Sequence, residues 1–147
     1  MIMSKSKALK IFIIAVRISL GLLFVYGGVK KFIPKPVRAS SAVETKVPDH
    51  VVKIRAFIGG MKQTGYFWTF LGISEIVCGL LLLSQALALL GAVMLIPLVL
   101  NIFLFHLFLE PHDTVELLLT GLYLLATIFL LGYDYPKLKM TFLNFNR

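Results

Sequence analysis

The sequence has a single cysteine, and its seven Asp and Glu residues are outnumbered by fifteen Lys and Arg residues. Cys78 lies inside an apolar run, so neither an internal disulfide nor a CxxC redox pair can form within one chain. The chain also lacks HxxxH, ExxH and repeated Cys motifs. Although His106, His112, Asp113 and Glu116 are of ligand-forming types, we therefore predict no metal site.

Apolar residues dominate what is present: 59% of the chain is hydrophobic, and its mean hydropathy is +0.90. An ordinary soluble domain has an apolar fraction of about 45–50%, so we predict a single integral membrane domain over residues 1–147. The net charge of +8 lies beside the apolar runs, where anionic lipid headgroups are closer than nucleic acid. We therefore expect a lipid bilayer as partner and no nucleic acid.

Four apolar segments are long enough to cross a hydrocarbon layer of about 30 Å at about 1.5 Å per helical residue. Each has one face of small or polar residues, which is typical of helices packed together in a membrane. The predicted fold is an all-α membrane protein, a four-transmembrane-helix bundle with both termini on one side. The spans cover about residues 9–29, 66–84, 87–108 and 115–133.

The long connection between the first two spans contains a second helical pattern. Val51, Ile54 and Ile58 recur at helical spacing, while Lys53 and Lys62 point elsewhere. This pattern predicts a short amphipathic helix at the membrane interface. We favour a peripheral helix that caps the bundle over a functional lid.

Arg17 and Glu75 each lie near the middle of a predicted span, where a charge costs about 2.5–3.5 kcal/mol on insertion scales. Opposite charges at one depth should meet, because pairing offsets part of the cost of burial. We predict a buried Arg17–Glu75 pair. The pair either fixes the helix register or forms a proton or substrate site.

A second polar group lies toward the side of the long connection. Asn101 and His106 carry polar groups that lipid cannot satisfy, so we expect both to face protein. Hydrogen-bond donors at this depth would suit a polar headgroup or a quinone ring. The candidate quinone site comprises Tyr26, Lys30, Asn101, His106, Glu116 and Tyr123.

The first span carries Arg17, Leu20, Gly21, Phe24, Gly27 and Lys30, and later spans carry Glu75 with Gly79, then Asn101 and His106. This order resembles the DoxX family of small bacterial membrane proteins. The resemblance implies a multi-pass protein of the bacterial inner membrane. Members similar to DoxD are subunits of thiosulfate:quinone oxidoreductases, and others belong to redox membrane complexes.

The resemblance favours a membrane subunit or accessory of a quinone-linked redox system, with a redox protein as partner and a quinone as ligand. No cofactor motif is evident in the residues themselves. Two alternatives are a proton-coupled carrier of a small solute, in which Glu75 titrates, and a structural scaffold without catalysis. Enzymatic activity, membrane orientation and oligomeric state stay open.

Overall fold

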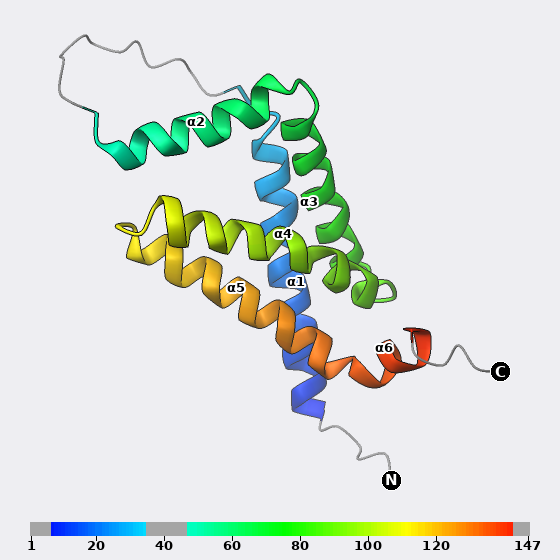
Figure 1. The fold of residues 1–147 in the computed structure, drawn as a ribbon. Helices are drawn as coiled ribbons and strands as arrows, with labels where there is room; N and C mark the ends of the chain where they lie inside the picture. The colour runs from blue at the N-terminus through cyan, green and yellow to red at the C-terminus, as the bar shows by residue number, and fades with distance from the viewer. Residues whose placement is uncertain (1–6, 35–46, 143–147) are drawn as a thin grey trace.

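The computed structural model describes residues 7–34 and 47–142, and every secondary-structure element in this part of the chain is a helix (Figure 1). Each predicted apolar segment overlaps one helix, and the predicted amphipathic segment forms another. In chain order the helices are α1 (Lys7–Lys30), α2 (Asp49–Gln63), α3 (Phe67–Leu83), α4 (Ala88–Leu109), α5 (Thr114–Tyr133) and α6 (Tyr135–Phe142).

Three helices, α1, α4 and α5, are long and apolar enough to cross a membrane. Helix α3 has 17 residues and meets α2 at an angle of 89°, so this bent pair adds a fourth crossing only if it counts as one span. The fold is that of a multi-pass α-helical membrane protein. The four-span count stays a prediction.

Helices α1 and α3 pack closely along two pairs of glycines. A Cβ atom added to Gly28 would lie 2.6 Å from the carbonyl oxygen of Gly72, and one added to Gly79 would lie 2.6 Å from that of Gly21. Such distances leave no room for a side chain, so the two backbones touch directly. Small residues commonly allow this approach in membranes, where lipid supplies no hydrophobic force between helices.

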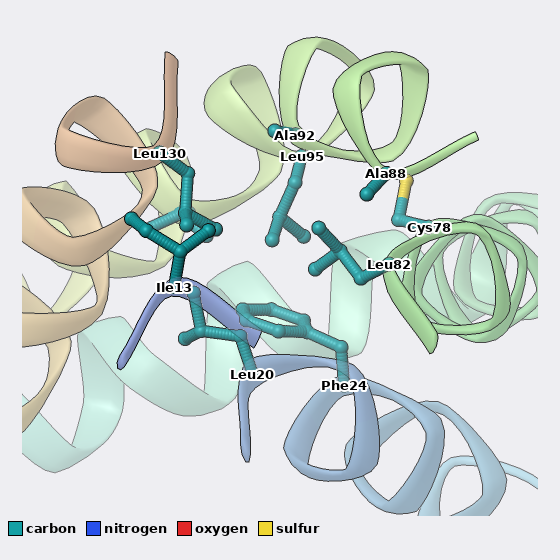
Figure 2. Packing of buried hydrophobic residues seen from close by; sticks show 10 residues of the cluster. Ile13, Leu20, Phe24, Cys78, Leu82, Ala88, Ala92, Leu95 and Leu130 are labelled. Atoms are coloured by element: carbon teal, nitrogen blue, oxygen red, sulfur yellow. The ribbon is translucent and has the colours of Figure 1, made fainter. Parts of the chain in front are cut away.

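Helices α4 and α5 form a second pair that crosses α1 steeply, with α3 and α4 also in contact (Figure 1). Asp113 caps the start of α5 by accepting a hydrogen bond from the backbone N–H of Glu116 at 3.1 Å. The core lies where the two pairs meet, with Phe24 of α1 and Leu82 of α3 beside Leu95 of α4 (Figure 2). Its buried members are Ile13, Leu20, Phe24, Cys78, Leu82, Ala88, Ala92, Leu95, Val99 and Leu130.

Helix α2 lies across the end of the molecule opposite the start of α1 (Figure 1). It has no buried residue, and its ring contacts reach α4 and the α4–α5 connection. The Phe57 and Phe105 ring centroids are 5.6 Å apart, and those of His50 and His112 are 5.4 Å apart. A membrane-surface position for α2 stays a prediction.

Candidate functional site

The first ionic centre lies where α1 ends against α3. Lys31, one residue beyond α1, places its Nζ 2.6 Å from Oε2 of Glu75, whose side chain is 2% exposed. The Trp68 indole N–H donates to the backbone carbonyl of Lys31 at 3.2 Å, which fixes the ring beside the pair. The buried carboxylate is thus held by one ammonium group at the boundary of the helix pair.

The second ionic centre involves Arg17, which lies in the first half of α1, away from Lys31. Arg17 pairs with Asp134, the residue between α5 and α6, and its Nη1 donates to the Gln85 side-chain oxygen at 3.4 Å. Lys137 places its ammonium 3.4 Å from the other Asp134 oxygen. Gln85 has a φ of 55°, a left-handed conformation that is uncommon for residues other than glycine. Arg17 therefore joins α1 to the α3–α4 turn and to the end of α5.

The predicted Arg17–Glu75 pair is wrong, because each side chain has a different partner. The glycine contacts set Gly21 against Gly79 and Gly28 against Gly72, which fixes the antiparallel register of α1 and α3. In this register Arg17 lies level with residue 83, about 12 Å along the axis from Glu75 at 1.5 Å per residue. Although Arg17 and Glu75 each lie near the middle of an apolar run, the two residues therefore do not lie at the same depth.

The partners Lys31, Gln85 and Asp134 were absent from the predicted site. Each lies just beyond a helix end. A polar residue at such a position is ordinarily solvated, so the sequence alone does not indicate that it binds a buried charge. A usable signal was nevertheless present in the sequence. Gly21 and Gly28 are seven residues apart, as are Gly72 and Gly79, and matching the two repeats antiparallel predicts the observed register.

The six residues of the candidate quinone site do not gather in one cavity. Tyr26 is 62% exposed, and the Lys30 ammonium lies 4.6 Å from the centre of its ring. Asn101 is exposed on α4, so the expectation that it faces protein within one chain is wrong. Tyr123 lines a groove between α1 and α5, whereas Lys30 lines a separate pocket at the far end of α1.

His106 and Glu116, the remaining predicted residues, lie on different helices of the α4–α5 pair. His106 is half-buried, and its Nδ1 lies 3.2 Å from Glu110 Oε2 without forming a hydrogen bond. Glu116 is exposed in the first turn of α5. Neither side chain forms a hydrogen bond or ion pair with Tyr26 or Tyr123 among the residues that the structure describes.

The groove between α1 and α5 has a volume of 640 Å³ and is almost entirely apolar. Two hydroxyl-bearing residues, Ser19 and Tyr123, contribute to its wall. In the described parts of the chain, the Tyr123 hydroxyl has no hydrogen-bond partner. The remaining lining residues are Phe12, Ala15, Val16, Leu20, Leu23, Leu122, Leu125, Ala126 and Phe129.

A smaller polar pocket of 500 Å³ lies between the start of α2 and the α4–α5 connection. His50, Glu110, His112 and Asp113 contribute to its wall. Over residues 7–34 and 47–142, no three His, Cys, Asp or Glu side chains are grouped closely enough to hold a metal ion.

Comparison with known protein families identifies the family of this chain. The model of the DoxX family matches residues 12–107, which include most of α1, all of α2 and α3, and most of α4. Arg17, Lys31, Glu75 and Gln85 lie within the matched part, whereas Asp134 lies beyond it. No curated protein and no solved structure matches the chain.

Proposed function

Because the chain belongs to the DoxX family, we propose that it is a membrane subunit of a quinone-linked redox system and holds the quinone in the α1–α5 groove. In this role the chain positions the ring while a redox partner protein exchanges electrons with it. The groove lies along two helices that are long and apolar enough to span the bilayer, so a quinone could enter it from lipid.

The observation that carries the proposal is that Tyr123 lines a groove whose other residues, apart from Ser19, are all apolar, and that its hydroxyl has no hydrogen-bond partner among the described residues. A quinone has a polar ring with carbonyl acceptors and an apolar tail, so it needs one well-placed donor and a long apolar wall. Tyr123 would supply the donor, and Leu20, Leu122 and Phe129 would pack against the tail. The volume of 640 Å³ lies within the range of about 300–1,000 Å³ that is usual for small-molecule sites.

The Arg17 centre supports the same location. The groove is formed by α1 and α5, and the Arg17–Asp134 pair joins α1 to the end of α5. A buried pair of this kind restricts how far the two helices can separate. We therefore assign Arg17 and Asp134 to positioning the groove walls rather than to contact with the ring.

Binding of a short-chain ubiquinone to the purified protein in detergent tests the proposal. Tyr123→Phe should weaken binding about fivefold to tenfold, because one hydrogen bond contributes about 1–1.5 kcal/mol. Ala126→Trp should abolish binding by filling the groove. Leu118→Trp is the matched control, since Leu118 lies on the same helix, is 69% exposed and is not part of the groove wall.

An isoprenoid alcohol that lacks the quinone ring separates ring recognition from general binding of apolar chains. The proposal predicts that this alcohol competes weakly and that Tyr123→Phe leaves its binding unchanged. Equal binding of ubiquinone to Ala126→Trp and to the unchanged protein would remove the groove as the site. Equal competition by the alcohol would remove the quinone as the ligand.

A scaffold function is the second candidate, favoured by the fact that both ionic centres join segments far apart in the sequence. In that case the buried charges serve only to fix the helices. The carrier alternative has less support from geometry, because Arg17 and Glu75 belong to separate pairs at different depths. If the isoprenoid alcohol competes as well as ubiquinone, or if Ala126→Trp binds ubiquinone as well as the unchanged protein does, the scaffold becomes the preferred function.

A further inference from the structure

A pocket of 330 Å³ lies where the ends of α1 and α2 meet the start of α3. It is distinct from the α1–α5 groove and shares no lining residue with it. Its wall combines three lysines with an indole and several apolar side chains. The lining residues are Lys30, Lys31, Phe32, Ile33, Pro34, Ile58, Lys62 and Trp68.

The positive charges in this pocket exceed the negative charges available to neutralise them. Glu75 pairs with Lys31 and is itself nearly fully buried. Among the described residues, no carboxylate lies within ion-pair distance of Lys30 or Lys62. The ammonium groups of Lys31 and Lys62 lie 5.6 Å and 4.9 Å from the centre of the Trp68 ring. Two ammonium groups beside one ring repel each other, so an anion bound between the lysines would be stabilised.

The location of the pocket specifies what kind of anion fits. Lys30 is the last residue of α1, and Trp68 is the second residue of α3, so both lie at the ends of apolar helices. Trp and Lys are typical of the headgroup level of a bilayer, where the indole is half in lipid and the ammonium reaches the polar region. Phe32, Ile33 and Ile58 add an apolar wall beside the charges.

We propose that this pocket binds the headgroup of an anionic phospholipid, with the phosphate at the lysine side chains that line the pocket and an acyl chain along the apolar wall. The charge excess selects an anion, and the position at the helix ends together with the apolar wall selects a lipid over a free ion. The bound lipid would hold α2 against α1 and α3. Basic pockets between membrane helices are a recurring form of headgroup recognition.

Trp68 is the only tryptophan in the chain and lies in the pocket, so its fluorescence reports directly on what binds there. Phosphatidylglycerol with brominated acyl chains, added to the protein in neutral detergent, should quench Trp68 more strongly than brominated phosphatidylcholine. Lys30→Gln and Lys62→Gln should each lower the preference for the anionic lipid about fivefold, the usual contribution of one basic side chain near an anionic surface.

Lys53→Gln is the matched control, because Lys53 is an exposed lysine on α2 that is not part of the pocket wall. It should change the preference little. An equal loss in Lys53→Gln and Lys62→Gln would mean general attraction to an anionic surface and would overturn the proposal. Displacement of brominated phosphatidylglycerol by millimolar inorganic phosphate would also overturn it, because the pocket would then bind a free anion. These variants leave the α1–α5 groove intact, so ubiquinone binding tests the two proposals separately.

Discussion

Each of the two charges in the middle of the apolar helices meets its partner at a helix end rather than on another helix interior. Lys31 extends to Glu75, whereas the long Arg17 side chain extends to the buried Asp134. Long side chains near helix ends can extend along an apolar surface, so a charge can neutralise a buried group while its own backbone lies near water. In both centres a long basic side chain neutralises a buried carboxylate that lies on, or just beyond the end of, another helix.

Lys31→Met should lower the free energy of unfolding in detergent by about 3 kcal/mol, because it leaves the Glu75 carboxylate buried without a partner. We expect the lower end of the usual range for a broken buried pair, since the Lys31 side chain retains 18% of its exposed surface. Denaturant titration of the purified variant measures the change. Met preserves much of the length of the Lys side chain, so packing against Trp68 is least disturbed.

The control for this prediction is the double variant Lys31→Met with Glu75→Gln. Removing both charges should recover part of the stability lost in the single variant, because no unpaired carboxylate remains. If the two changes simply add, the Lys31–Glu75 contact contributes nothing to stability.

Arg17→Gln and Glu75→Gln should act independently, because the two residues belong to separate ionic centres. Changes at sites more than about 7–10 Å apart without shared partners usually add to within about 0.5 kcal/mol. By contrast, Arg17→Gln with Asp134→Asn should show a coupling free energy. Unfolding titrations of both double variants decide between the observed pairing and the one predicted from sequence. Coupling of Arg17 to Glu75 would contradict the structure.

At the scale of helices, the sequence was sufficient to predict α1 to α5, but it predicted neither α6 nor the way the helices pack against one another. The apolar runs predict α1, α3, α4 and α5, and the helical spacing of Val51 and Ile54 predicts α2. Hydropathy depends on residue type alone and therefore finds helices. Crossing angles and register depend on which small residues touch, and Gly28 against Gly72 is a contact between distant positions. The residues of the candidate quinone site were chosen by their depth along each apolar run, without knowledge of these contacts. For this reason the structure places them apart.

Gly28→Ala should destabilise the α1–α3 pair by about 1–3 kcal/mol, the usual cost of adding a methyl group to a close-packed interface. The added Cβ would lie 2.6 Å from the backbone oxygen of Gly72, and a backbone atom cannot move aside as a side-chain end can. The melting temperature in detergent should therefore fall.

Gly60→Ala provides the control, because Gly60 lies in α2 and a Cβ there would have no neighbour within 4 Å. Alanine is favoured over glycine inside a helix by about 0.5–1 kcal/mol, so this variant should be neutral or slightly stabilised. A fall in melting temperature of equal size in both variants would contradict direct contact of the two backbones.

At the scale of the whole molecule, the two ionic centres lie toward opposite ends of the helix bundle. At one end, the contacts of the Arg17 centre join the first half of α1 to the α3–α4 turn and to the start of α6. At the other end, the Glu75 centre and the proposed lipid pocket lie where the end of α1, the end of α2 and the start of α3 meet. The groove proposed for the quinone lies between α1 and α5 along this axis. Ligand binding and lipid binding are thus assigned to different depths of one small protein.

These two ends predict the membrane topology. If α1, α3, α4 and α5 all cross the bilayer, Lys10 and Lys139 lie on one side, and Lys53 and His112 lie together on the other. The 5.4 Å contact between the His50 and His112 rings already places α2 beside the α4–α5 connection.

Cysteines introduced singly at these four exposed positions can be labelled with an impermeant maleimide in sealed vesicles of fixed orientation. The native Cys78 is 0% exposed, so background labelling should be low. We expect Lys10→Cys and Lys139→Cys to share one accessibility and Lys53→Cys and His112→Cys to share the opposite one, with all four labelled after detergent is added. Should Lys10→Cys instead group with His112→Cys, the bent α2–α3 pair returns to the side it started from, and the chain crosses the membrane three times.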